Sequence, residues 1–151
     1  MLDEIIIVHE ISVEDFLSLR QMVHFQILQK NEAQCILEHT SYISAASFQG
    51  NIIGVTRLLY DYGTDAYITD VIVNPQYQGQ GVGRMLIEDV VAYVKNHSFS
   101  NVRVTCNLYA NVGKEAFYEK LGFSKLPFGK YGYGMLIAMH EKEMRFDLNL
   151  D

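Results

Sequence analysis

The chain has 151 residues, with 12 Lys and Arg against 18 Asp and Glu, a formal net charge of −6, 49% hydrophobic residues and two cysteines. A chain of about 150 residues buries roughly 68–70% of its unfolded surface, so it can form a core without disulfides or metals. Its two prolines, eleven glycines and 20% charged residues exclude a disordered or collagen-like chain. We expect a single domain over residues 1–151.

The net charge, the cysteines, the histidines and the apolar stretches limit the possible partners. The acidic balance argues against nucleic acid, because phosphate binding depends on clustered Lys and Arg. Cys35 and Cys106 form no CxxC motif, which favours two buried free thiols in a reducing compartment. The five histidines have no HxxxH or HExxH spacing, so we expect no metal. No apolar stretch is long enough to span a membrane, and the acids before the first apolar run are unlike a signal peptide. We expect a cytoplasmic protein with no membrane partner.

The first third of the chain predicts one strand and two helices. Ile5–Val8 is a short β-branched run, typical of a buried strand. Ser12 offers a helix N-cap with Asp15 three residues on. Apolar residues then follow at helical spacing, at Phe16, Leu19, Val23 and Ile27. A second short helix is expected from Asn31 to His39.

The middle of the chain changes to the period of strands. Residues 42–48 and 52–60 predict two strands, joined by Gln49-Gly50-Asn51, where Gly and Asn tolerate the positive φ of a tight hairpin. A further strand is expected over residues 66–73. Together these segments predict a three-stranded antiparallel meander.

The second half predicts alternating helices and strands. Apolar residues repeat every four positions in a helix ending near His97, at Val82, Leu86, Val90 and Val94. Residues 102–108 alternate as a strand, which the crossover from residues 66–73 should make parallel. A helix opens at Asn111 and ends at Gly122, and residues 134–140 predict a last strand. The fold class is therefore α/β (α+β), with a mixed central sheet of six to seven strands and about four helices.

A glycine-rich turn, Gln-Gly-Gln-Gly-Val-Gly at residues 78–83, lies between a strand end and a helix start. The main-chain N–H groups of such a turn have no intrahelical partner and lie at the positive end of the helix dipole, which suits a phosphate. Arg84 adds charge. A plain tight connection could use the same glycines. The turn lacks the GK[ST] of a Walker A loop and the G-x-G-x-x-G spacing of dinucleotide-binding proteins.

Two segments together resemble the GNAT (Gcn5-related) N-acetyltransferases. The first, VNPQYQGQGVGRMLI over residues 73–87, is similar to their acetyl-CoA signature, Gln/Arg-x-x-Gly-x-Gly/Ala, at Gln78, Gly81 and Gly83. The second, NVGKEAFYEKLGF over residues 111–123, looks like the second cofactor segment of the family. The resemblance covers nearly the whole chain and implies the GNAT fold with acetyl-CoA as co-substrate.

The resemblance also implies which residues contact acetyl-CoA. The main chain of Val71 and Val73 would bond to the pantetheine arm, and the N–H of Val71 would polarise the thioester carbonyl. Gln78 belongs to the signature, Asn111 would bond to the pantetheine arm, and Lys114 would reach the phosphates. Backbone N–H groups along the turn would hold the pyrophosphate: Gly79, Gln80, Gly81, Val82, Gly83 and Arg84.

The resemblance makes Tyr118 the general acid beside the thioester sulfur, since a phenol with a pKa near 10 is protonated at neutral pH. Alternatively, Tyr118 is only a core aromatic. The family's base positions fall on Tyr67 and Thr69, neither of which is a good base. Asp70 is the nearest carboxylate, but strand alternation turns it to the opposite face unless a bulge re-aims it. We expect a water relay instead.

The acceptor site is predicted from Tyr67 and from residues 128–135, which resemble the variable loop beside the acceptor site of small family members. Tyr131 and Tyr133 would line an amine pocket, with cation–π contact to a protonated ligand. The same loop could equally be a hairpin turn with surface tyrosines. His24 and Phe25 are weaker candidates for the opposite wall.

The predicted function is direct transfer of acetyl from acetyl-CoA to a primary amine in a ternary complex. The negative charge favours a small cationic amine, while peptide N-termini and protein lysines stay open. A non-catalytic acyl-CoA sensor or interaction module is the main alternative, and a nucleotide-binding protein is the third. Dimers are common in the family, so a homodimer also stays open.

Overall fold

The computed structural model describes residues 4–140, and its contacts divide the chain into two compact units, one up to Tyr109 and one from Ala110 on. The expected single domain over residues 1–151 stays a prediction. The first unit contains β1 (Ile5–Val8), α1 (Val13–Met22), α2 (Lys30–Glu38), β2 (Tyr42–Phe48), β3 (Asn51–Tyr60), β4 (Asp65–Val73), a 3₁₀ turn (Pro75–Tyr77), α3 (Val82–His97) and β5 (Thr105–Asn107). The second unit contains α4 (Glu115–Lys120).

One sheet organises the first unit, with the strand order β1-β2-β3-β4-β5. Strands β1 to β4 are antiparallel, and β5 lies parallel to β4, as the crossover predicted. The mixed α/β fold is confirmed, although the sheet has five strands instead of six to seven. Residues 134–140 form no strand, because their side chains are exposed and they pair with no neighbouring strand in the described part of the chain.

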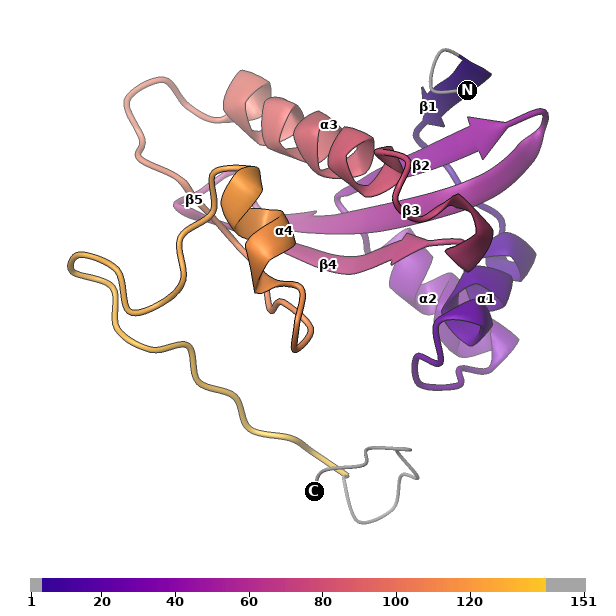
Figure 1. The fold of residues 1–151 in the computed structure, drawn as a ribbon. Coiled ribbons are helices and arrows are strands. Elements are labelled where there is room, and N and C mark those ends of the chain that lie inside the picture. The colour runs from indigo at the N-terminus through magenta and orange to yellow at the C-terminus, as the bar shows by residue number, and fades with distance from the viewer. Residues whose placement is uncertain (1–3, 141–151) are drawn as a thin grey trace. The chain divides into compact units, whose positions relative to one another are not determined.

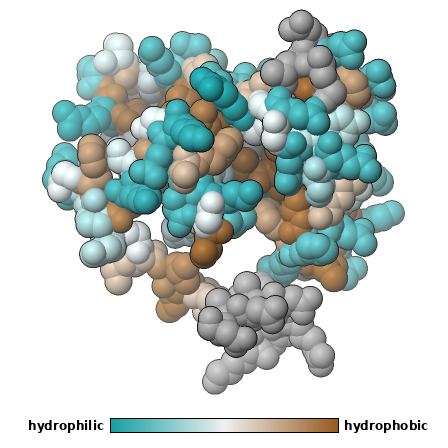
Figure 2. All heavy atoms as spheres, viewed as in Figure 1, coloured by the Kyte–Doolittle hydropathy of each residue, from teal (hydrophilic) through white to brown (hydrophobic). Residues whose placement is uncertain are grey.

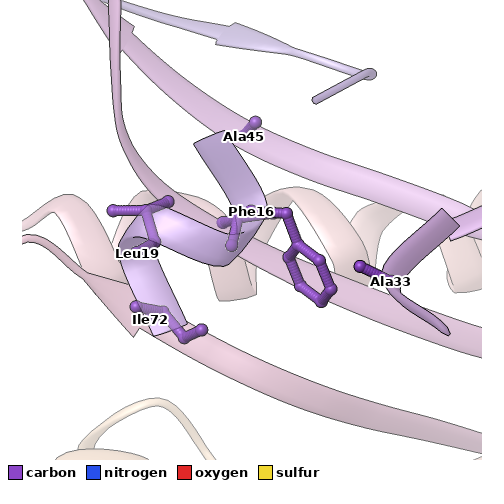
Figure 3. Packing of buried hydrophobic residues seen from close by; sticks show 6 residues of the cluster. Phe16, Leu19, Ala33, Ala45 and Ile72 are labelled. Atoms are coloured by element: carbon purple, nitrogen blue, oxygen red, sulfur yellow. The ribbon is translucent and has the colours of Figure 1, made fainter. Parts of the chain in front are cut away.

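Helices cover both faces of this sheet (Figure 1). Ile53 of β3 packs on one face against Val82 and Leu86 of α3. The opposite face packs against α1 and α2 through a cluster shown in Figure 3, formed by Phe16, Leu19, Ala33, Ala45, Val55 and Ile72. Burying apolar side chains on both faces leaves a surface on which polar residues cover much of the visible side (Figure 2).

Helix α1 begins as predicted but ends early. The Ser12 hydroxyl accepts a hydrogen bond from the Asp15 N–H at 3.0 Å, which confirms the N-cap. At the other end His24 has φ +60°, and the Phe25 N–H returns to the Arg20 carbonyl at 2.9 Å. A left-handed residue closes a helix in this way. Ile27 therefore lies in a loop and is 88% exposed, so its predicted place on the helix is wrong.

Helix α2 was predicted one residue late, and its cysteine is not buried. The buried side of α2 is formed by Ala33, with Ile36 and Leu37 partly buried against the same cluster. Cys35 lies off this face and is exposed, while Cys106 is only half-buried. The expectation of two buried cysteines is therefore wrong for Cys35.

The start of α3 lies very close to β3 at Gly54. A Cβ atom at this position would lie 3.1 Å from the Ile72 carbonyl oxygen and 3.2 Å from side-chain carbons of Val82 and Leu86. Such contacts are tighter than most Cβ contacts in proteins, so a side chain here would force its neighbours to move by a few tenths of an ångström. The close approach fixes where α3, and the turn that leads into it, sit on the sheet.

Candidate functional site

The turn between β4 and α3 is tied to the end of β4. The Asn74 side chain accepts from the Gln76 N–H at 3.0 Å, and the Asn74 N–H donates to the Ile53 carbonyl at 2.8 Å. The side-chain amide of Gln78 donates to the Val73 carbonyl at 3.1 Å. Gln78, predicted as a cofactor residue, thus holds the turn against the strand.

The glycines give this turn its shape. Gly79 has φ +78°, and Gly81, the N-cap of α3, has φ +86°. The first hydrogen bond of the helix runs from the Met85 N–H to the Gly81 carbonyl at 3.1 Å. The N–H groups of Val82, Gly83 and Arg84 precede this bond, and the first turn of α3 holds no acidic residue. The turn therefore forms a cradle of N–H donors at a positive helix end, as expected for an anion site.

The polar side chains of the turn are exposed. The Arg84 guanidinium donates from Nε to Oε1 of Glu88 at 2.8 Å, and both side chains are more than half exposed. An exposed pair of this kind contributes at most about 1 kcal/mol, so Arg84 can exchange Glu88 for another anion at little cost. The Gln80 amide lies 3.5 Å from the Gln76 carbonyl oxygen.

Strand β4 contains a bulge directly before the turn. Thr69 pairs with Arg57 and Ile72 with Val55, so Asp70 and Val71 together oppose the single residue Thr56. Asp70 has φ +50°, in the left-handed region. The extra residue changes the alternation and turns Asp70 to the face of Arg57. The bulge that would re-aim Asp70, which the sequence alone did not decide, is therefore present.

Beyond the bulge, β4 extends past its parallel neighbour. The β4–β5 pairing runs from Asp65 with Thr105 to Tyr67 with Asn107 and ends there, whereas β4 continues to Val73. Val71 and Val73, the predicted main-chain contacts of the pantetheine arm, are half-buried in this extension. An extended ligand could pair with the strand edge on this side.

Asp70 lies between two arginines. Its Oδ1 accepts from a terminal nitrogen of Arg20 at 2.9 Å, and its Oδ2 accepts from Arg57 Nε at 2.7 Å. The three side chains are only 10–11% exposed. Both carboxylate oxygens are held by guanidinium groups, so Asp70 is poorly placed to take a proton from an acceptor. This cluster was not predicted from the sequence, where its only signals were Arg20 near the apolar stripe of the first helix and Arg57 within an apolar strand.

A hollow of about 230 Å³ lies beside this cluster, between α1 and the loop that follows it. Phe25, a weaker acceptor-site candidate, lines it, whereas His24 does not. The lining residues are Leu17, Arg20, Gln21, Phe25, Gln26, Ile27 and Leu28. Tyr67 is half-buried on β4 and meets the Tyr109 ring edge to face, with centroids 5.6 Å apart. Burial is the main cause that raises the pKa of Tyr67.

The second unit holds the other predicted cofactor residues. Asn111 and Lys114 form a turn in which the Lys114 N–H donates to the Asn111 carbonyl at 2.9 Å, with Gly113 at φ +91°. Helix α4 begins only at Glu115, after this turn, so its predicted start at Asn111 is too early. Its end is as predicted, because Gly122 has φ +99° and the Phe123 N–H returns to the Tyr118 carbonyl at 3.1 Å.

Tyr118 is the buried residue of α4. It is 9% exposed and meets Phe117 and Phe123 edge to face, at centroid distances of 5.0 and 5.8 Å. Burial raises the pKa of the Tyr118 phenol, so its hydroxyl keeps its proton at neutral pH. Tyr118 is thus a core aromatic that also meets the protonation requirement of a general acid.

The predicted acceptor loop is a tight turn. Phe128 and Tyr131 exchange two backbone hydrogen bonds of 2.9 Å around Gly129, which has φ +55°. The Lys130 ammonium lies 5.6 Å from the centre of the Tyr131 ring. Tyr131 and Tyr133 are 38% and 77% exposed. This loop is thus a hairpin turn with surface tyrosines, which was one of the two alternatives predicted from the sequence.

The sequence profile of the Acetyltransferase (GNAT) family matches residues 5–123. The chain belongs to this family. No helix within residues 4–140 is both long and apolar enough to cross a membrane.

Several curated relatives share part of the sequence. Histone acetyltransferase TAP1 of Glycine max is 36% identical over 61% of this chain and 38% of its own length. Serotonin N-acetyltransferase 2, chloroplastic, of Oryza sativa subsp. japonica is 33% identical over 70% of this chain and 52% of its own. The chain therefore spans only about 40–50% of the length of these two relatives.

Solved structures match more of the chain. A probable acetyltransferase from methicillin-resistant Staphylococcus aureus has a TM-score of 0.77 at 26% identity, over 89% of this chain and 98% of its own. A GNAT family acetyltransferase from Streptococcus pneumoniae TIGR4 has a TM-score of 0.73 at 25% identity, over 89% and 98%.

Proposed function

We propose that this protein is an acetyl-CoA-dependent N-acetyltransferase whose acceptor is a primary amine, with direct transfer in a ternary complex. The main support for the proposal is the order of three structural features along β4 and into α3. A bulge at Asp70–Val71 is followed by the strand end at Val73 and then by a cradle of N–H groups at the start of α3. In a member of the GNAT family, this arrangement suits a ligand with a thioester, an extended arm and a pyrophosphate.

Three parts of the chain support acetyl-CoA as the acyl donor. The cradle offers backbone donors at a helix start without acidic residues, which suits the pyrophosphate. The part of β4 beyond Tyr67 offers main-chain groups of Val71 and Val73 to the amide-bearing arm. By family resemblance, Asn111 and Lys114 of the second unit add contacts to the arm and the phosphates.

The proposed chemistry needs an oxyanion donor and an acid. Acetyl-CoA supplies an activated acyl carbon, at which the C–N bond to the amine forms and the C–S bond breaks. The N–H of Val71 donates to the carbonyl oxygen while negative charge develops there. By family resemblance, Tyr118 of the second unit gives its proton to the departing sulfur. The surplus proton of the amine leaves through water, which returns a proton to Tyr118, because the Asp70 carboxylate is held by Arg20 and Arg57.

The acceptor is proposed as a small primary amine. By family resemblance, its candidate contacts are Tyr67 of the first unit and Tyr131 and Tyr133 of the second. The net charge of −6 favours a cationic ligand. Two relatives are named for histone and serotonin, which differ greatly in size. An acceptor panel therefore needs alkylamines, serotonin, a polyamine and a lysine-containing histone peptide.

The test is thiol release from acetyl-CoA with each amine of this panel. We expect turnover with at least one small amine, a sequential kinetic pattern, and a kcat lower by about 10²-fold or more in Tyr118→Phe. Tyr62→Phe, which removes a hydroxyl that bonds to Tyr93, is the matched control and should keep kcat. Ping-pong kinetics would contradict direct transfer. CoA binding without turnover on any amine would support the acyl-CoA sensor instead.

A further inference from the structure

The cluster of Arg20, Asp70 and Arg57 lies directly beside the proposed oxyanion donor. We propose that Asp70 is a positioning residue: clamped by the two arginines, it holds the bulge of β4 in the form that directs the Val71 N–H at the acyl carbonyl. This inference rests on the proposed function. It assigns Asp70 no contact with substrate and no proton transfer.

The backbone links Asp70 to the donor. The N–H of Val71 belongs to the planar peptide unit that begins at the carbonyl carbon of Asp70. Rotation about the backbone bonds of Asp70 therefore turns the Val71 N–H directly. Asp70 has φ +50°, a conformation that L residues other than Asn and Asp rarely adopt. The donor direction thus depends on a conformation that other contacts must stabilise.

The clamp supplies those contacts from different elements. Arg20 comes from α1 and Arg57 from β3, and they hold separate oxygens of the carboxylate at 2.9 and 2.7 Å. Each arginine is itself anchored. Arg20 donates to the Gln26 carbonyl at 3.0 Å, and Arg57 donates to the Thr40 hydroxyl at 2.9 Å. The Asp70 side chain is therefore fixed in position relative to both α1 and β3.

The energetics favour a positioning role over a purely stabilising one. Removing charged groups from water costs about as much as a buried ion pair returns, so apolar residues in such positions often stabilise a fold at least as well. Two arginines do fix the orientation of a carboxylate that they both hold, because each guanidinium group donates hydrogen bonds in its own plane. Arg20 also lines the hollow, so the clamp connects that hollow to the bulge.

The test uses Asp70→Asn in the full chain. Asn has nearly the same shape and tolerates positive φ, but it removes the charge that both arginines bind. Loss of a single oxyanion donor lowers kcat by about 10²–10³-fold, and a misdirected donor should lose at least about tenfold. We expect this fall in kcat with an almost unchanged KM for acetyl-CoA. Asp61→Asn, at the other end of the β3–β4 hairpin, is the matched control and should keep kcat.

A conservative series guards against a simple folding defect. Arg57→Lys keeps the positive charge, so its kcat should lie closer to wild type than that of Arg57→Gln at the same folded fraction. Wild-type kcat in Asp70→Asn would overturn the proposal. So would a fall in kcat that only follows the loss of folded protein.

The amide signal of Val71 separates this proposal from the proposed function. In wild type it should shift on addition of acetyl-CoA and much less on addition of CoA, and Asp70→Asn should lose this difference. If wild type turns over no amine, the proposed function fails, while the amide signal still decides the positioning role. Equal responses to the two ligands in wild type, or the same difference in Asp70→Asn, would overturn it.

Discussion

The two faces of the sheet are built differently. On the face covered by α3, the core of Ile53, Val82 and Leu86 is apolar. The face covered by α1 and α2 also has an apolar cluster, but it adds Arg20, Arg57 and Asp70 at 10–11% side-chain exposure. The contrast suggests a division of labour, in which one face supplies stability and the other places charged groups where the bulge needs them.

Breaking the charged cluster should have the largest effect. Arg57→Met leaves Asp70 with only one of its two guanidinium partners in a nearly dry site, so we expect the free energy of unfolding to fall by about 3 kcal/mol. Urea unfolding measures this loss. Arg103→Met changes an exposed arginine and should cost less than about 0.5 kcal/mol. Equal stability of the two variants would contradict the contrast between the faces.

A cavity on the α3 face should cost a comparable amount of stability but little of the reaction rate. Leu86 is fully buried, and Leu86→Ala should lower the free energy of unfolding by about 2–5 kcal/mol. At a temperature where the variant is folded, kcat with saturating acetyl-CoA should stay close to wild type. Val91→Ala, on the exposed side of the same helix, is the control. A large loss of kcat in folded Leu86→Ala would show that the α3 face also serves chemistry.

A mutation in the cradle should have a smaller effect, on the affinity for CoA. Gly81→Ala places a side chain at φ +86°, a conformation that costs about 1 kcal/mol. We expect the free turn to relax out of this conformation, so that restoring the cradle on binding raises the Kd for CoA about fivefold. Gly50→Ala introduces the same strain at φ +80° in the β2–β3 turn, where a Cβ meets nothing within 4 Å. Calorimetric titration with CoA should show weaker binding only for Gly81→Ala. Equal losses would mean that the turn acts through general stability.

The smallest expected effect is that of pH on kcat, through the buried phenol of Tyr118 in the second unit. Burial raises the pKa of Tyr118 above its ordinary value near 10, so the protonated acid is present below that value and is lost only as the pH rises through it. We therefore expect kcat to show no alkaline decline between pH 7 and about 10. A decline centred near pH 8, present in wild type and absent in Tyr118→Phe, would contradict the assignment.

Local sequence signals predicted most of the fold. The Ser12 cap, the antiparallel meander and the Gly122 helix end each depend on a few neighbouring residues, and the structure has all three. The glycine-rich turn could be predicted for the same reason. Ile27 was misplaced because His24 closes α1 in a conformation that apolar spacing does not reveal.

The clamp around Asp70 could not be predicted from such signals. Its bonds join residues 50 and 13 positions apart in sequence, and they form only because a bulge shifts the register of β4 against β3. Strand alternation alone placed Asp70 on the other face. A bulge depends on how two strands pair, which a single segment does not encode.

Gly54 has a consequence for how the binding site would be mapped. It lies under the start of α3, where any side chain would press on the Ile72 carbonyl, Val82 and Leu86. Displacing the helix by a few tenths of an ångström would move every N–H donor of the cradle together. In a mutational scan scored by CoA affinity, Gly54 should therefore rank with the turn residues, although it comes from a different strand. A library confined to the turn would miss this position.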